Sequence, residues 1–289
     1  MNPTRMVMQI RNALSNLNPK EVREQAAMPV SIEIFASTPR VHEEMANYFA
    51  PAQQMSGERY TTATGQIRRG GEGSGPAVIR IFEEGVAHDG QAFVYSKAKP
   101  EQVVCDILER HPEWKLALAR QFVPFRKPVS DEIILSVSKE NAVFSVATSV
   151  PTLMPFLALP WAVGEFASDT AFLTMNQIRM AFMLAAANDR TIGYREQKAE
   201  IASLFAGAFG WRAIARELIG VIPMGAGIIP KAGIAFAGTF VMGMSLERFY
   251  RIGYGMTPAE RKQAYSEAVE KGKAIAANLL NSYKTQKAG

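Results

Sequence analysis

The chain has 289 residues and a mass of 31.7 kDa, a length typical of one large domain or two. Apolar residues make up 48% and charged residues 20%, which excludes a wholly disordered protein, a collagen-like fibre and a small disulfide scaffold. The single cysteine, Cys105, allows no intramolecular disulfide, so we expect a reducing compartment. No uninterrupted apolar run opens the sequence, so we expect no export signal.

The net charge of +5 is unevenly distributed along the chain. Residues 1–141 hold 17 Lys and Arg against 17 Asp and Glu, whereas residues 142–289 hold 15 against 10. The basic half also contains the longest uncharged stretches, a combination that favours an anionic membrane surface as partner. Nucleic acid is disfavoured, because acidic residues interrupt the basic ones and no continuous basic patch forms.

Strands and helices alternate through the first half. Asn18-Pro19-Lys20-Glu21 has the composition of a helix start, with Pro at the first helical position. Residues 30–36 alternate apolar and polar as a strand does, and Thr38-Pro39 begins a helix that reaches Phe49.

The same alternation continues beyond a glycine-rich segment. Residues 65–76 carry five glycines in twelve residues, which predicts a loop. The pattern then predicts strands at residues 77–82, 91–95 and 115–120, with a helix over residues 100–110. Strands alternating with helices favour an α/β domain with a mostly parallel sheet.

The second half has the pattern of helices throughout. Helices are predicted over residues 141–164, 165–188 and 196–217, and a further apolar stretch occupies residues 218–246. Thr257-Pro258-Ala259-Glu260 is a capping box that opens the last helix.

These patterns predict two domains. We expect residues 1–136 to form the α/β domain and residues 137–289 to form an all-α, glycine-rich apolar domain.

The motifs of a nucleotide hydrolase are missing from the first half. The turn after the first strand, residues 36–42, has neither the glycines nor the lysine of a phosphate-binding loop. The strand at 77–82 runs into Glu83-Glu84-Gly85, and no base-reading N-K-x-D motif occurs. We favour an ordinary capped turn at this helix start. The alternative is a site in which the helix N-terminus, assisted by Arg40, binds an anion.

Other candidate chemical groups also have structural interpretations. Arg68 and Arg69 among glycines are compatible with an anion-binding nest, but a solvated loop is favoured. Cys105 lies among apolar residues of a predicted helix, which predicts a small core residue. No metal-ligand spacing and no nucleophile motif occurs, so the sequence predicts no catalytic residue, metal or cofactor, and enzyme activity is the less favoured interpretation.

The second half resembles a bacterial family of unknown function. Its domain follows Era-like GTPase domains in some proteins and forms the conserved part of YcjF-like inner-membrane proteins in others. The matching segments are residues 159–165, 176–180, 207–212, 222–223 and 235–240 with Gly243. The resemblance implies association with GTPases and with the membrane. The first half resembles a degenerate GTPase or Rossmann-like domain in strand order.

Two complete membrane spans are disfavoured. Prolines divide residues 141–164, and Pro223 and Pro230 are expected to interrupt residues 218–246, where a span would also require Lys231 to be buried. The intervening residues 165–217 carry several arginines, which opposes the positive-inside tendency. Shallow helical hairpins and a soluble apolar core both remain as interpretations.

Small residues recur every four positions at Ala235, Thr239 and Gly243. Such a stripe lets two helix backbones approach closely. Packing within the same domain is the favoured interpretation, and a contact between subunits of a homo-oligomer is the alternative.

A polar stripe follows the helix predicted over residues 165–188, at Glu165, Asp169, Asn176 and Arg179. A solvent-exposed helix face is the favoured explanation. The alternative is a buried ionic network in which Arg179 is the counter-ion of Glu165 and Asp169.

The sequence thus predicts a non-catalytic binding or scaffold protein at the cytoplasmic face of a bacterial inner membrane, or in the cytoplasm. One alternative is a GTPase-like enzyme with a divergent phosphate loop, and another is a soluble self-assembling protein. The sequence names no protein partner.

Overall fold

The computed structural model describes residues 18–71, 78–88, 90, 92–149, 169–202 and 227–288. They fall into two compact units. The α/β unit comprises Lys20–Ser130 and Ala185–Thr191, and the helical unit comprises the described residues of Asp131–Leu184 and Ile192–Gly289. An α/β region followed by an all-helical region is the fold class that the sequence predicts. The predicted boundary between residues 136 and 137 falls inside helix α7 (Val123–Ser149).

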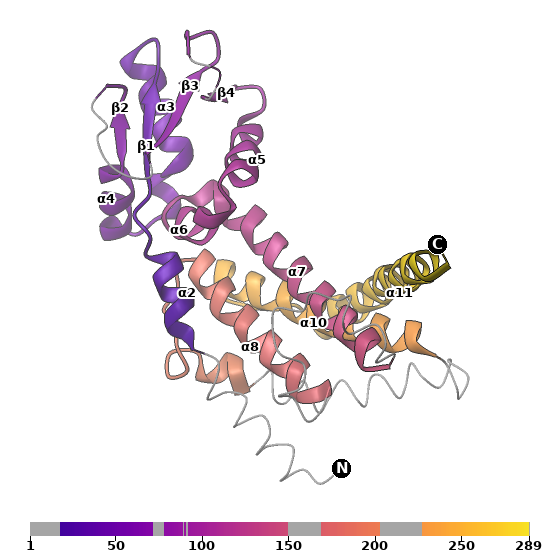
Figure 1. The fold of residues 1–289 in the computed structure, drawn as a ribbon. Helices are drawn as coiled ribbons and strands as arrows, with labels where there is room; N and C mark the ends of the chain where they lie inside the picture. The colour runs from indigo at the N-terminus through magenta and orange to yellow at the C-terminus, as the bar shows by residue number, and fades with distance from the viewer. Residues whose placement is uncertain are drawn as a thin grey trace. The chain divides into compact units, whose positions relative to one another are not determined.

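The α/β unit is built on a fully parallel sheet of four strands in the order β2-β1-β3-β4 (Figure 1). The strands are β1 (Ser31–Phe35), β2 (Ile67–Arg69), β3 (Val78–Glu83) and β4 (Phe93–Tyr95). Three of them, β1, β3 and β4, lie where the apolar alternation predicts strands. The described helices of the unit are α2 (Pro19–Ala26), α3 (Pro39–Phe49), α4 (Gly57–Gly65), α5 (Pro100–Arg110) and α6 (Lys115–Gln121), with 3₁₀ turns η1 (Ala52–Gln54) and η2 (Pro112–Trp114).

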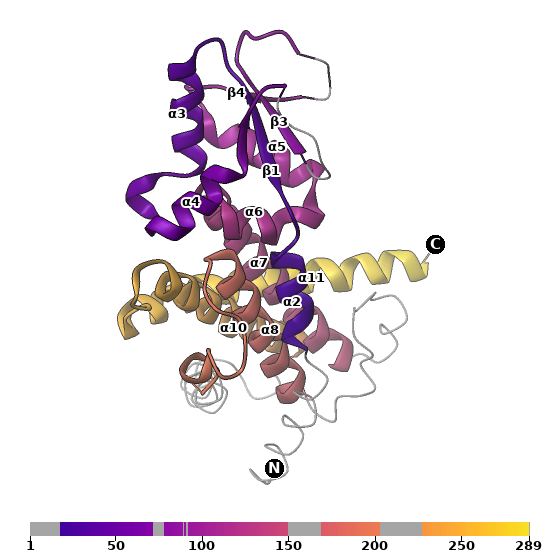
Figure 2. The same cartoon turned by 90° about the vertical axis from the view of Figure 1, so that its left-hand side faces the viewer.

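One face of this sheet is apolar, with aliphatic and aromatic side chains. Ile34 of β1 is level with Ile81 of β3, which is level with Phe93 of β4, so all three side chains lie on the same face. Two helices meet that face: the ring of Tyr48 in α3 lies 5.5 Å from Tyr95, and the guanidinium of Arg110 in α5 lies 4.3 Å from the ring of Phe93. Figure 2 shows α3 along one side of the strands. The core of the unit forms here.

The opposite face of the sheet is charged. Glu33 in β1 is level with Arg68 of β2 on one side and with Arg80 of β3 on the other. Opposite charges in register on neighbouring strands stabilise their pairing. The same face also carries the stacked rings of Phe35 and Phe82. Glu33 is 5% exposed and accepts the N–H of Gly71 at 2.7 Å. The charges at Glu33 are therefore compensated within the fold.

Two predictions for the α/β unit are wrong. Residues 115–120 form helix α6 instead of a strand, because Leu116, Ala117, Leu118 and Ala119 are all buried, at 3% exposure or less. Four consecutive buried positions do not fit an alternating strand with one exposed face, and Leu and Ala are strong helix formers. Cys105 is exposed on α5 instead of buried, since the inward face of that helix carries Val103, Val104 and Ile107.

The predicted loop over residues 65–76 contains an element that the sequence pattern missed. Ile67–Arg69 form β2, which pairs in parallel with β1 and begins level with Ile32. A strand of three residues is too short to show an alternating apolar pattern in the sequence. Its pairing with β1 in the structure is what identifies it.

The helical unit contains the C-terminal part of α7 with α8 (Asp169–Ala187), α10 (Ile228–Ile252) and α11 (Pro258–Ala288). The predicted capping box opens α11: Thr257 N–H donates to Glu260 Oε2 at 2.8 Å, and Glu260 N–H donates to Thr257 Oγ1 at 3.3 Å. Residues 150–168 and 203–226, where several predicted helices fall, lie outside the described residues.

Helices α10 and α11 are antiparallel neighbours joined by a short turn (Figure 1). Two glycines make their contact close. A methyl group added to Gly272 would lie 2.6 Å from Phe236 Cβ and 2.9 Å from Gly233 Cα. The two backbones therefore touch at Gly233 and Gly272, and any larger side chain would separate the helices.

Pro230 lies at the start of α10, and Pro223 and the rest of residues 218–226 lie outside the described residues. Pro230 is the third residue of α10, inside the first helical turn, where a backbone N–H has no partner within the helix. Helix α10 therefore runs unbroken over 25 residues. Lys231 is exposed, and its Nζ donates to Thr148 Oγ1 and Ser149 Oγ, both at 3.3 Å.

Candidate functional site

The α/β unit has one position at which sheets of this kind hold ligands. Strand order reverses around β1 and β3, and ligands of open parallel sheets bind beyond the carboxyl ends of the strands at such a switch point. Here the chain leaves β1 at Phe35 and enters α3 at Pro39, while β3 ends at Glu83. We call Ser37, Thr38 and Glu83 the strand-end turn.

A carboxylate of the protein itself occupies the strand-end turn. The backbone N–H of Ser37 donates to Glu83 Oε2 at 2.6 Å. Thr38 caps α3, and its Oγ1 accepts the N–H of Val41 at 3.3 Å. In phosphate-binding turns such N–H groups point at the ligand. In this chain a phosphate would have to displace Glu83 and then lie beside its negative charge.

Further charges near the strand-end turn belong to local ion pairs. Hydrogen bonds from Ser37 hold the pKa of Glu83 below its usual value, so the carboxylate is ionised at neutral pH. The Glu44 carboxylate of α3 pairs with Lys97 at 2.8 Å and with Arg40 at 3.3 Å. Arg40 therefore turns along its own helix toward Glu44, and Thr38 forms the ordinary helix cap that the sequence favours over an anion site assisted by Arg40.

The helical unit holds a second constellation, a buried polar network made of Asn141, Asn176, Gln177 and Thr239. Asn141 Nδ2 donates to Thr239 Oγ1 at 2.7 Å, and Asn176 Nδ2 donates to Asn141 Oδ1 at 2.9 Å. Gln177 Nε2 also donates to Thr239 Oγ1, at 3.3 Å, and that hydroxyl donates to the Ala235 carbonyl at 3.0 Å. All four side chains are at most 7% exposed. The network joins α7, α8 and α10 through donors and acceptors that have no access to water.

The stripe of small residues predicted as a packing interface lies on the buried side of α10. Ala235 is 7% exposed and Thr239 is 1% exposed. A methyl group on Gly243 would lie 2.8 Å from Ile134 Cγ1 and 2.9 Å from Met180 Sδ, so α10 meets α7 and α8 there. The stripe thus makes helix contacts within one chain.

The predicted ionic network is placed only in part. Glu165 lies outside the described residues, and Asp169 begins α8. Arg179 forms an ion pair with Glu140 of α7, and their side chains are 19% and 22% exposed. The favoured interpretation of this stripe as a solvent-exposed face is wrong at Asn176, which is 4% exposed, because α7 covers this side of α8.

Three residues of these contacts were missed by the sequence argument: Glu140, Asn141 and Gln177. These buried contacts could have been suspected from the amide side chains in two otherwise apolar stretches. Asn141 begins one uncharged stretch, and Asn176-Gln177 lies within another. A buried amide needs a partner, and amides in separate apolar helices are natural partners for each other.

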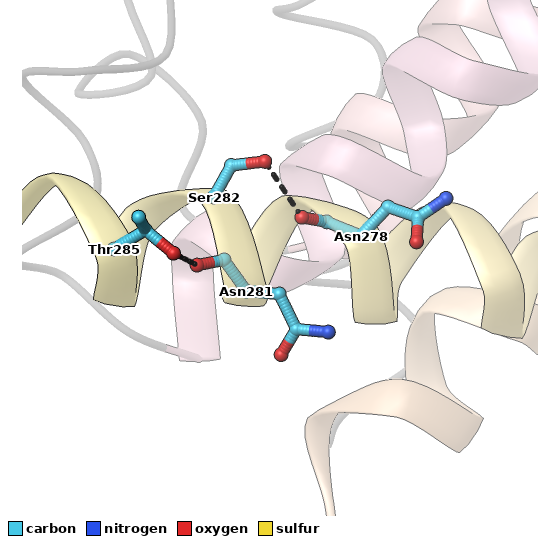
Figure 3. Close-up of a pocket in the computed structure, with 4 residues that line it drawn as sticks. All are labelled: Asn278, Asn281, Ser282 and Thr285. Carbon is cyan, nitrogen blue, oxygen red and sulfur yellow. Dashed lines mark hydrogen bonds between the residues drawn. The ribbon is translucent and has the colours of Figure 1, made fainter.

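A shallow depression on α11 is lined by Asn278, Asn281, Ser282 and Thr285 (Figure 3). Ser282 Oγ donates to the Asn278 carbonyl at 2.9 Å, and Thr285 Oγ1 donates to the Asn281 carbonyl at 3.0 Å. Both hydroxyls are thus bonded to their own helix, and the depression is the polar side of one helix.

The described part of the chain brings together no group of three or more His, Cys, Asp or Glu side chains suited to a metal ion. Comparisons with protein-family models, with curated proteins and with solved structures found no match for this chain.

Proposed function

We propose that this chain is a non-catalytic binding or scaffold protein that attaches to the cytoplasmic face of a bacterial membrane. Its α/β unit is the binding module and its helical unit is the attachment module. The observation that carries the proposal is the hydrogen bond from Ser37 N–H to the Glu83 carboxylate. The carboxylate lies at the position where a sheet of this topology would bind a phosphate. A site filled by a fixed anion of the protein favours a binding surface over nucleotide chemistry.

Attachment to a membrane is supported by the helical unit. Among the described residues, α10 is the one helix that is long and apolar enough to cross a bilayer, with a mean hydropathy of 1.4 in its most apolar 18-residue window, of which 50% is buried in the fold. Its contacts use small residues and interhelical hydrogen bonds to buried amides, both of which hold helices together in lipid. The core helix of a soluble self-assembling protein meets the same criteria, so localisation has to be measured.

The positive charge of the second half supports binding at the surface of the bilayer. Residues 142–289 carry 15 Lys and Arg against 10 Asp and Glu. Each Lys or Arg near an anionic surface contributes about 1 kcal/mol, and salt screens this contribution.

Fractionation of bacterial cells tests the attachment. We expect the protein in the membrane fraction and its partial release by high salt or carbonate. Protein found wholly in the soluble fraction would support the self-assembly alternative. Protein extracted by detergent alone would support full spans.

Calorimetry tests whether the strand-end turn binds nucleotides. We expect no heat of binding when the wild-type protein is titrated with GTP, ATP or their diphosphates, and any binding gained by Glu83→Gln is attributed to removal of the competing carboxylate. Glu24→Gln, an exposed residue of α2 paired with Lys20, is the charge-matched control. Micromolar nucleotide binding by the wild-type protein, altered in Glu83→Gln and unaltered in Glu24→Gln, would contradict the proposal and favour a divergent nucleotide enzyme.

A further inference from the structure

The turn that follows α8 has an unusual residue at its left-handed position. Asp189 N–H donates to the Ala186 carbonyl at 3.1 Å, and Arg190 N–H donates to the Ala185 carbonyl at 2.7 Å, which together form a Schellman motif. Asp189 occupies the position that glycine usually takes in this motif, with a φ of 53°. A strained backbone at a residue other than glycine persists where the surroundings fix its side chain.

Arginines fix the carboxylate of Asp189. Arg59 Nε of α4 lies 2.8 Å from Asp189 Oδ2, and Arg120 Nε of α6 lies 3.7 Å from Oδ1. Arg126 of α7 is also close, with its Nε donating to the Ala119 carbonyl at 3.3 Å. All these residues belong to the α/β unit. We call Arg59, Arg120, Arg126 and Asp189 the arginine cluster.

Positive charge in this cluster exceeds negative charge. Arg59 and Arg120 share the Asp189 carboxylate, and Arg126 lies within electrostatic range of the same carboxylate while its Nε donates to the Ala119 carbonyl. Burial lowers the pKa of Arg126, and the neighbouring Arg59 and Arg190 lower it further, whereas Asp189 raises it. In the described part of the chain Arg126 forms no ion pair of its own. A partly buried cation with too little counter-charge is stabilised by an added anion.

The cluster is accessible to an anion from solution. The side chains of Arg59 and Arg120 are 46% and 38% exposed, while that of Asp189 is 13% exposed. Guanidinium groups bind tetrahedral oxyanions through paired N–H donors and remain charged at every physiological pH. Phosphate groups match this donor geometry and carry the charge that the cluster lacks.

We propose that the arginine cluster binds a phosphate group, carried either by a soluble polyphosphate or by a lipid headgroup. The Asp189 carboxylate holds the arginines in position when no ligand is bound, and it competes with the phosphate group for them. This site lies apart from the strand-end turn in sequence, and it does not depend on the function proposed above.

Titration of the full-length protein with pyrophosphate, followed by calorimetry, tests the site. We expect saturable, salt-sensitive binding that Arg120→Gln weakens about tenfold, since a charge-assisted hydrogen bond contributes roughly 1.5 kcal/mol. Arg126→Gln should weaken binding more, and Arg120→Gln remains informative if the buried Arg126 variant unfolds. Arg40→Gln, whose side chain is 89% exposed on α3, makes the same charge change elsewhere and should have no effect.

Asp189→Asn separates ligand binding from a purely structural role. Asparagine tolerates the left-handed conformation, so the turn is retained while the competing charge is removed. We expect tighter pyrophosphate binding by Asp189→Asn, with an unchanged circular dichroism spectrum. If the arginines only anchored the turn, this variant would lose stability and would gain no affinity.

Vesicle flotation distinguishes the two sources of phosphate. Vesicles of phosphatidylcholine alone are compared with vesicles of equal parts phosphatidylcholine and phosphatidic acid. Arg120-dependent flotation with phosphatidic acid, without pyrophosphate binding, assigns the site to a lipid headgroup, and the reverse pattern assigns it to a soluble ligand. The proposal would be overturned if neither the wild-type protein nor Asp189→Asn bound pyrophosphate or floated with phosphatidic acid. It would also be overturned if Arg40→Gln weakened binding as much as Arg120→Gln.

Discussion

The two units of this protein differ in where their candidate functional polar contacts lie, although both bury some polar side chains, such as Asn188 and Ser130 in the α/β unit. In the α/β unit the core is aliphatic and aromatic, and the Glu83 carboxylate lies on the surface at the end of the sheet, where it meets the Ser37 N–H. In the helical unit Asn141 and Thr239 are 0% and 1% exposed and bond to each other between helices. A surface bond can be exchanged for water, whereas a buried one cannot. The buried contact between Asn141 and Thr239 should therefore be less tolerant of substitution than the surface contact between Glu83 and Ser37.

The largest expected effect comes from the closest contact in the helical unit. Gly272→Val would place methyl groups against Phe236 and the backbone of Gly233, which cannot yield without separating α10 from α11. We expect a loss of about 3 kcal/mol in the free energy of unfolding. Urea denaturation followed by circular dichroism measures it.

Gly65→Ala is the matched control in the α/β unit. Gly65 ends α4, and a methyl group added there meets nothing within 4 Å. Stability should change by no more than about 0.5 kcal/mol, in the stabilising direction, because alanine restricts the unfolded chain. Equal losses in the two glycine variants would contradict the contrast between the units.

Removing an amide from the buried polar network should have the next largest effect. Asn141→Ala deletes the acceptor of the Asn176 amide and the donor to Thr239. We expect a loss of about 2 kcal/mol, because the partners remain buried without replacement by water. The exposed counterpart is Thr38→Ala, which deletes the N-cap of α3 and should cost about 1 kcal/mol. Chemical denaturation of both variants compares a buried polar contact with a surface one.

The smallest effects concern two surface carboxylates and appear as a dependence of stability on pH. Hydrogen bonds from Arg248 and then from Thr257 lower the pKa of Glu260 from 4.5 to about 2. A lowered pKa stabilises the fold above pH 4.5, and this contribution is lost as the pH falls toward 2. Glu260→Gln should flatten the acid limb of the stability profile measured by thermal unfolding.

Glu83→Gln should act in the same direction as Glu260→Gln. Its carboxylate also has a lowered pKa, chiefly through its hydrogen bonds with Ser37. The variant should flatten the acid limb less, since no arginine bonds to Glu83 among the described contacts. A steeper acid limb in either variant would contradict the assignment.

Local signals predicted much of this fold correctly. Thr257 and Glu260 lie three residues apart, so their reciprocal bonds were visible in the sequence. The Ser37–Glu83 bond joins residues 46 positions apart, and only the parallel pairing of β1 with β3 brings them together. The absence of phosphate-binding motifs was therefore visible in the sequence. The hydrogen bond of the Glu83 carboxylate to the turn after β1 was not.

Pairwise contacts over long sequence distances account for the rest. Thr239 was identified from its small-residue spacing, but its partner Asn141 is 98 positions away. From the sequence, Arg179 was considered as a counter-ion of acidic residues on its own helix. In the structure its partner is Glu140, which lies on a neighbouring helix. Spacing along one helix reveals which face is polar, whereas the partner depends on how the helices pack.

The α10–α11 hairpin limits how the chain can meet a bilayer. Helix α10 packs along α11 through Phe236, Val241, Tyr265 and Ala268, and α11 carries charged side chains on its outer face. Lipid cannot surround α10 while α11 covers it, and α11 is too polar to enter the hydrocarbon alongside it. A spanning α10 would therefore require the hairpin to open and exchange Phe236–Ala268 contacts for acyl chains. The folded hairpin therefore excludes a spanning α10, and the backbone contact at Gly233 and Gly272 stabilises that folded hairpin.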